Sequence, residues 1–217
     1  KDLFDLVWGS ISGMRRILVL LFLLSTLVNC SDIERLQARD SHSTILAFGD
    51  SLTYGTGTSR TNAYPAVLER LTGRKVINAG IPGETSGKGL LRLPNLINQY
   101  QPDLIIICHG ANDILRKLDL TRTRDNIQQM IDMARQNNSQ VILIGVPKFS
   151  LFLDTSPIYQ YLAERNKIPL EKNSLSDIIG NNTLKSDHVH PNSDGYRILA
   201  ENITSLLEHS GAIQTLK

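Results

Sequence analysis

The sequence has little of what marks several classes of protein. Its 217 residues include two cysteines, Cys30 and Cys108, too few for a framework of disulfides, and only one tryptophan. The 23 basic and 21 acidic residues nearly cancel, so the chain lacks the positive charge that favours a nucleic-acid partner. Internal repeats and low-complexity tracts are also missing from the sequence. The remaining profile, 41% hydrophobic and 20% charged residues, is typical of a globular protein with one domain.

The longest apolar run, residues 17–28, is shorter than the roughly 20 residues that span a bilayer. It follows Met14, Arg15 and Arg16, and basic residues before a short apolar run are the order of a secretory signal. We therefore predict that translation starts at Met14 and that residues 1–29 comprise upstream residues and a signal peptide. Residues 30–43 are expected to form a polar tether, and residues 44–217 one domain.

The signal ends in Leu-Val-Asn-Cys at residues 27–30, which resembles a bacterial lipobox. In a lipobox, the cysteine becomes lipid-modified and forms the new N-terminus after cleavage. The resemblance implies lipidation at Cys30 and membrane attachment through the N-terminus, with the domain in the periplasm of a bacterial cell envelope. A simple signal peptide that releases the protein, or an uncleaved anchor with an incidental Cys30, is the alternative. Cys108 lies in an apolar run, where it is expected to pack as a small buried side chain.

Short apolar runs rich in β-branched residues alternate with segments of helical periodicity. The apolar runs predict strands at residues 44–48, 75–79, 103–109 and 140–146, with a weaker fifth at 168–171. The periodic segments predict helices at residues 64–71, 87–99, 122–136, 157–166 and 193–209. This alternation, with short connections, implies right-handed βαβ units. The predicted fold is a three-layer α/β/α sandwich with a central, mostly parallel, five-stranded sheet.

Ligands of such open sheets bind beyond the carboxyl ends of the strands, so the residues that follow each strand are of most interest. Gly-Asp-Ser follows the first strand at residues 49–51. The second strand leads into Gly-Ile-Pro-Gly-Glu-Thr-Ser at 80–86, and the third into Gly-Ala-Asn-Asp at 110–113. A serine hydroxyl at this edge can act as a nucleophile only beside a base that a third group orients. Ser51 is the candidate nucleophile.

A candidate base lies in the segment that precedes the last predicted helix, which contains His188 and His190. Asp187 stands three residues before His190, a spacing at which one turn can bring the carboxylate back against the imidazole ring. Asp187, His188 and His190 are also metal-ligand types. Three adjacent ligands without a distant fourth make a weak site, so no metal is predicted.

Each of these segments also has a purely structural explanation. Asp50 or Ser51 could cap the helix that follows, and Asn112 could form a turn or a helix cap. Glycine at residues 80 and 83 could serve a tight turn that needs positive φ. The segment with the two histidines could simply start a helix, with Asn192 or Ser193 as its cap. No single segment decides between structure and catalysis.

Four segments taken in order resemble the sequence blocks of the SGNH hydrolase family, also called the GDSL family. They are FGDSL at 48–52, NAGIPGETS at 78–86, GAND at 110–113 and DHVHP at 187–191. The segments AYPAVLERL and GLLRLPNLINQYQPDLIII are similar to the bacterial, periplasmic branch that contains thioesterase I, lysophospholipase L1 and arylesterases. The resemblance implies the flavodoxin-like fold of this family and a site that works without a metal or other cofactor.

The same resemblance implies a role for each matching residue. Ser51 is expected to be the nucleophile, His190 the base and then the acid, and Asp187 the carboxylate that orients His190. The oxyanion donors would be the backbone N–H groups of Ser51 and Gly80 and the side-chain amide of Asn112. The implied activity is a serine esterase that hydrolyses small acyl esters or thioesters through an acyl-enzyme.

Two other functions stay open for the sequence alone. A carbohydrate O-acetylesterase or acetyltransferase of the envelope would use the same scaffold, and a non-catalytic binding lipoprotein would use none of the chemistry. A hint about the substrate lies after the fourth strand, where Phe149, Leu151 and Phe152 could form an apolar wall for an acyl chain. The alternative is that these three side chains pack a short helix onto the core.

Overall fold

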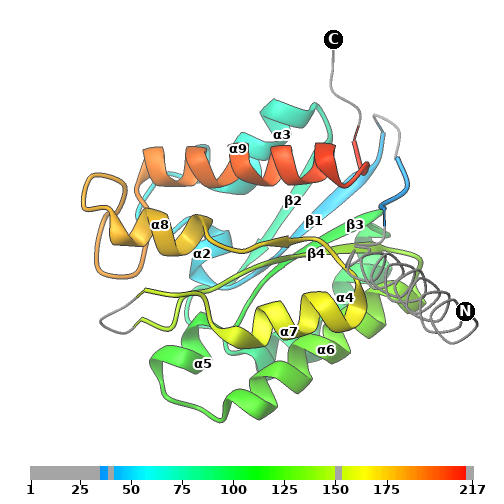
Figure 1. Ribbon diagram of the computed structural model, residues 1–217. Coiled ribbons are helices and arrows are strands. Elements are labelled where there is room, and N and C mark those ends of the chain that lie inside the picture. Colours follow the sequence, from blue (N-terminus) through cyan, green and yellow to red (C-terminus); the bar gives the residue numbers. More distant parts are fainter. Residues whose placement is uncertain (1–34, 39–41, 150–152, 214–217) are drawn as a thin grey trace, which may run out of the picture. The chain divides into compact units, whose positions relative to one another are not determined.

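The computed structural model describes residues 35–38, 42–149 and 153–213 (Figure 1). The chain divides into two units, Lys1–Asp32 and Ile33–Lys217, and every described residue lies in the second. The predicted start at Met14, the signal peptide and Cys30 fall outside the described residues. Within those residues, no helix is both long enough and apolar enough to cross a membrane.

A five-stranded sheet forms the centre of the second unit. The strands are β1 (Thr44–Gly49), β2 (Lys75–Gly80), β3 (Leu104–Cys108), β4 (Gln140–Ile144) and β5 (Leu170–Glu171). Their order is β2-β1-β3-β4-β5, and every neighbouring pair is parallel. All residues of β3 are buried, as a parallel strand covered on both faces requires. The predicted parallel sheet is confirmed, and its order is that of flavodoxin-like folds.

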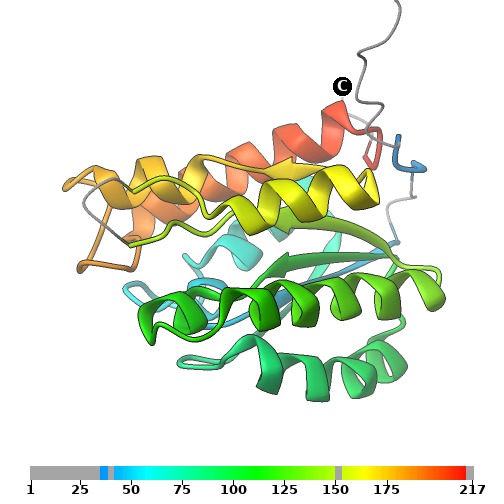
Figure 2. The ribbon, with the colours of Figure 1, turned by 60° about the horizontal axis from the view of Figure 1, so that its bottom comes forward.

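Helices cover both faces of the sheet and make the predicted three layers. Figure 1 shows α3 (Tyr64–Thr72) and α9 (Ser193–His209) above the sheet and α4 (Ser86–Tyr100), α6 (Leu120–Gln136) and α7 (Pro157–Asn166) below it. The helices α3 and α9 pack on each other. The helices α4 and α6 also pack on each other, and Figure 2 shows them side by side. All five match predicted helices, because each presents an apolar face with helical spacing.

Among the described residues, the structure has three short helices besides the five predicted from apolar periodicity. They are α2 (Ser51–Tyr54), α5 (Ala111–Leu115) and α8 (Ser174–Gly180). Helices of four to seven residues are too short for an apolar period to show, so only their caps could have indicated them.

The fourth strand also ends earlier than predicted. Val146 accepts a hydrogen bond from the backbone N–H of Ser156, and Pro147 forms an antiparallel bridge with Thr155. This segment therefore pairs with the returning chain and leaves the parallel sheet, although Val146 is buried. The apolar run in the sequence extends beyond Ile144, the last residue of β4, because the side chain of Val146 is also buried.

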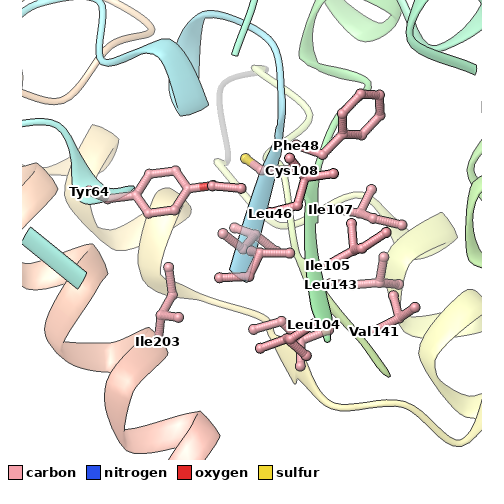
Figure 3. Close-up of a cluster of buried hydrophobic side chains, with 14 of the residues drawn as sticks. Leu46, Phe48, Tyr64, Leu104, Ile105, Ile107, Cys108, Val141, Leu143 and Ile203 are labelled. Carbon is pink, nitrogen blue, oxygen red and sulfur yellow. The ribbon is translucent and has the colours of Figure 1, made fainter. Parts of the chain in front are cut away.

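The core lies on both sides of the strands (Figure 3). Tyr64 and Ile203 pack on one side, and Ile105, Ile107 and Leu143 on the other. Cys108 is fully buried, which confirms the expectation for this side chain, and burial raises the pKa of its thiol well above the ordinary value. The packed strands bring their carboxyl ends to one edge, where α2, α5 and the loop before α9 also lie (Figure 1).

Candidate active site

Three polar side chains from two distant parts of the chain meet at the carboxyl edge of the sheet. His190 Nε2 lies 2.9 Å from Ser51 Oγ, although the two residues are 139 positions apart in sequence. On the other side of the ring, His190 Nδ1 lies 2.7 Å from Asp187 Oδ2. A carboxylate only accepts hydrogen bonds, so Nδ1 carries the ring proton and Nε2 is left to accept from the serine hydroxyl. The structure thus brings together Ser51, His190 and Asp187 in one chain of hydrogen bonds.

The strand-to-helix turn after β1 exposes the Ser51 hydroxyl. Asp50 is the N-cap of α2, and its side chain accepts a hydrogen bond from the backbone N–H of Leu52 at 3.1 Å. The sequence allowed either Asp50 or Ser51 to cap this helix, and in the structure Asp50 is the cap. Because Asp50 satisfies the helix terminus, the Ser51 hydroxyl remains available to His190.

The loop before α9 holds its histidine through one carboxylate. Asp187 Oδ1 accepts hydrogen bonds from the backbone N–H groups of Val189 and His190, both at 2.8 Å. Desolvation raises the pKa of Asp187, but the hydrogen bonds from Val189 and His190 outweigh it and hold that pKa below the ordinary value. Asp187 is therefore an ionised, pre-oriented acceptor for the imidazole.

The helix-start explanation of this segment also holds. The Asn192 side chain caps α9 by accepting from the backbone N–H of Gly195 at 3.1 Å, so this helix cap coexists with the hydrogen bonds among Ser51, His190 and Asp187. His188 is exposed and lies outside the chain of hydrogen bonds just described. Among the described residues, no cluster of side chains could hold a metal ion.

The three groups expected to donate to an oxyanion lie at the ends of β1, β2 and β3. Gly80 ends β2, and a side chain there would overlap the backbone of Tyr54, so the close approach of these segments requires glycine. The N–H of Gly80 donates to Asn78 Oδ1 at 3.1 Å. Asn112 Nδ2 donates one hydrogen to the carbonyl of Glu84 at 3.0 Å, and a primary amide has a second N–H to offer.

A cavity of about 180 Å³ adjoins the serine and the histidine. Ser51, Asn112 and His190 contribute to its lining, whereas Gly80 does not. Its apolar wall comes from Leu52, Pro82, Ala111, Leu115, Phe149 and Val189. Of the predicted acyl wall, Phe149 thus lines the cavity, while Leu151 and Phe152 lie outside the described residues.

Sequence reasoning assigned only Phe149 to this lining and missed its other apolar residues, among them Leu115 and Val189. Leu115 comes two residues after the GAND segment, and Val189 stands between the two histidines. Their position beside polar site residues was the available signal. Two half-exposed hydrophobic residues do not distinguish a cavity wall from ordinary surface without the fold.

Residues 47–198 match the model of the GDSL-like lipase/acylhydrolase family. Over 166 residues, the chain is 31% identical to thioesterase 1/protease 1/lysophospholipase L1 of Escherichia coli. The aligned region covers 73% of this chain and 80% of that protein. The chain is 31% identical over 180 residues to an arylesterase of Vibrio mimicus, covering 76% and 88% of the two chains.

Solved structures resemble the fold over the same region. The crystal structure of TesA matches with a TM-score of 0.69 at 27% identity and covers 77% of this chain and 99% of its own. The psychrotrophic esterase EstA from Pseudoalteromonas, inhibited by monoethylphosphonate, matches with a TM-score of 0.68 at 25% identity, covering 77% and 97% of the two chains.

Proposed function

The chain belongs to the GDSL-like lipase/acylhydrolase family, and on that premise we propose that it hydrolyses small carboxylic esters or thioesters at Ser51. The single observation that carries the proposal is the hydrogen-bonded chain from Ser51 Oγ through His190 to Asp187, with distances of 2.9 Å and 2.7 Å. The relatives named thioesterase, lysophospholipase and arylesterase all belong to this reaction class.

The proposed reaction uses these side chains and water. Ser51 Oγ attacks the acyl carbonyl while its proton passes to His190 Nε2, and the ionised Asp187 stabilises the imidazolium that forms. The tetrahedral intermediate collapses as His190 protonates the leaving alcohol or thiol, which leaves an acyl group on Ser51. Water then attacks the acyl-enzyme by the same steps in reverse order and releases the carboxylic acid and the free serine.

The oxyanion of the tetrahedral intermediate needs fixed donors. We assign this role to the N–H of Ser51, the second N–H of the Asn112 side chain and the N–H of Gly80, which would share its hydrogen with Asn78 Oδ1. One such donor typically contributes about 3 kcal/mol of transition-state stabilisation. Asn112 is suited to the role because its amide is neutral and does not lose a proton.

The acyl group would occupy the apolar cavity beside Ser51. Leu115, Phe149 and Val189 present hydrocarbon there, and a site lined in this way favours an acyl chain over a sugar ring, which would need several polar partners. This lining therefore supports hydrolysis of acyl esters or thioesters over the removal or transfer of acetyl groups on carbohydrates.

A fluorophosphonate probe tests the nucleophile directly. We expect covalent labelling of Ser51 in the folded protein, and loss of both labelling and ester turnover in Ser51→Ala. Activity is then measured on ester and thioester panels of increasing chain length. An unreactive Ser51 in folded protein would support a binding lipoprotein instead, and turnover confined to O-acetylated glycan would support the carbohydrate esterase.

The cellular location is a separate proposal. The basic residues and apolar run before Cys30 support export to the periplasm and lipid attachment at this cysteine. Mass spectrometry of the mature N-terminus tests it. A diacylglyceryl mass on an N-terminal Cys30 is expected, and an unmodified Cys30 would contradict lipidation.

A further inference from the structure

A largely buried ion pair that the proposed reaction does not use contacts the segments that carry the proposed oxyanion donors. Arg92 Nε and Nη2 contact the carboxylate of Glu84 at 2.8 Å and 2.7 Å. The side chain of Glu84 is 6% exposed and that of Arg92 21% exposed. Desolvation raises the pKa of Glu84, but hydrogen bonds from His109 and Arg92 hold it below the ordinary value, so the pair is ionised. A buried charge pair often adds little to the free energy of unfolding, because desolvation of the two charges offsets their attraction.

Arg92 reaches from α4 to the ends of two strands. Its Nη2 donates to the carbonyl of Ala79 at 2.7 Å and to the carbonyl of Gly49 at 3.2 Å. The Ala79 carbonyl and the Gly80 N–H belong to one peptide group, and because that group is planar, a held carbonyl fixes the direction of the N–H. Gly49 stands two residues before Ser51, so the same guanidinium also restrains the backbone that leads to the proposed nucleophile. The guanidinium lies over the ring of Phe48, 4.4 Å from its centroid, which limits its own movement.

Glu84 extends the connection to the third donor. Its backbone carbonyl accepts from Asn112 Nδ2 at 3.0 Å, and this bond aims the second N–H of the amide. Its carboxylate accepts from His109 Nε2 at 3.2 Å. His109 Nδ1 in turn accepts from the backbone N–H of Gly110, so the hydrogen resides on Nε2 and the fully buried ring donates to Glu84. A side chain at Gly89 would overlap this ring, so the glycine of α4 makes room for it.

We propose that the ion pair between Glu84 and Arg92 is a positioning unit, which holds the three proposed oxyanion donors in fixed relative positions. The unit touches no substrate and acts through the backbone ends of β1 and β2 and through Asn112. His109 anchors the Glu84 carboxylate from the end of β3. The inference rests on the proposed function, because it assigns a task to groups that matter only if an oxyanion forms.

Physical reasons favour arginine for this task. Its planar fork holds a carboxylate and backbone carbonyls at once, whereas a lysine ammonium is a single point charge. Catalytic donors must be placed within about 0.5 Å of the productive geometry, and a displacement near 1 Å can reduce the rate by about 100-fold. Loss of the fork should therefore slow the chemical step and leave ground-state binding in the cavity nearly intact.

Arg92→Lys and Glu84→Gln are the test variants, and Arg124→Lys is the matched control. Arg124 forms an exposed ion pair with Asp125 at 2.8 Å. With a p-nitrophenyl ester, we expect kcat to fall by about 10- to 100-fold in either test variant while KM changes by less than about threefold. The control should keep both constants. Circular dichroism and thermal unfolding identify folded variants, and Glu84→Gln decides the matter if Arg92→Lys does not fold.

The double variant tests whether the two residues act as one unit. Its kcat should be no lower than the kcat of the less active single variant. When two residues act as one unit, the losses caused by their separate substitutions do not add in free energy. A folded variant that loses thermal stability but keeps the wild-type kcat would show a purely structural ion pair and overturn the inference, as would losses that simply multiply. Wild-type protein with no ester turnover and no labelled Ser51 would instead refute the proposed function, and the inference with it.

Discussion

The carboxylate of Asp187 binds both the backbone and the side chain of His190. Oδ1 accepts the backbone N–H at 2.8 Å, and Oδ2 accepts the ring Nδ1–H at 2.7 Å. The hydrogen bond to Oδ1 therefore shapes the loop, and the hydrogen bond to Oδ2 selects the ring tautomer whose unprotonated Nε2 faces Ser51.

Asp187→Asn should reduce kcat by about 1,000-fold or more, because the amide can offer an N–H to Nδ1 and stabilise the wrong tautomer. Ester hydrolysis by the purified variant measures this. Asp194→Asn is the control, since Asp194 lies on the surface in the first turn of α9 and forms an exposed ion pair with Arg197 at 3.8 Å. Nearly normal turnover in Asp187→Asn would show that the carboxylate does not orient the base.

Asp50 gives the protein a pH-dependent stability. Desolvation raises its pKa above the ordinary 3.8, against the opposing effects of His109 and the Leu52 N–H. The folded state therefore binds more protons than the unfolded chain between the two pKa values, and the free energy of unfolding falls as the pH rises through that window. Asn keeps the cap and has no charge to bury. Asp50→Asn should gain stability relative to the wild type as the pH rises above 3.8, the ordinary pKa of the carboxyl group.

Urea unfolding at several pH values, monitored by circular dichroism, measures this difference. A constant gap between the two proteins across the pH range would mean that Asp50 ionises normally in the fold.

The side chain of Phe149 is expected to set chain-length preference. It lines the cavity beside Ser51, so Phe149→Ala should lower kcat/KM for longer acyl esters by up to about 10-fold and leave acetyl esters nearly unaffected. Tyr161→Ala, on the exposed side of α7, serves as the control. An unchanged order of preference on p-nitrophenyl esters would rule out the proposed acyl wall.

Two glycines of neighbouring elements should respond in opposite ways to alanine. Gly80→Ala places a methyl group against the backbone of Tyr54, so it should lower both the midpoint of thermal unfolding and ester turnover. At Gly87, in the first turn of α4, a methyl group meets only Asn126 Nδ2 at 3.6 Å. Gly87→Ala should leave turnover intact and raise the free energy of unfolding by up to about 1 kcal/mol. Equal effects at the two positions would contradict the packing described for the end of β2.

The sequence by itself determined the layers of the fold. Runs such as 104–108 are apolar at every position, and only a strand covered on both faces uses such a run between two amphipathic helices. It also placed Ser51 and Asn112 beyond strand ends, because parallel strands bring their carboxyl ends to one edge whatever their detailed packing, and it placed His190 just before the last helix.

Tertiary structure alone decided the distances and the sharing of hydrogen bonds. Asp50 caps α2, and the Gly80 N–H donates to Asn78 Oδ1. The sequence offers several possible acceptors for each N–H, and only the three-dimensional geometry determines which one accepts. The approach of Arg92 to the ends of β1 and β2 depends on the packing of α4 against the sheet. Glu84 lies in the segment NAGIPGETS, but nothing in the sequence connects it with Arg92 and His109, since only tertiary packing brings the members of a buried polar cluster together.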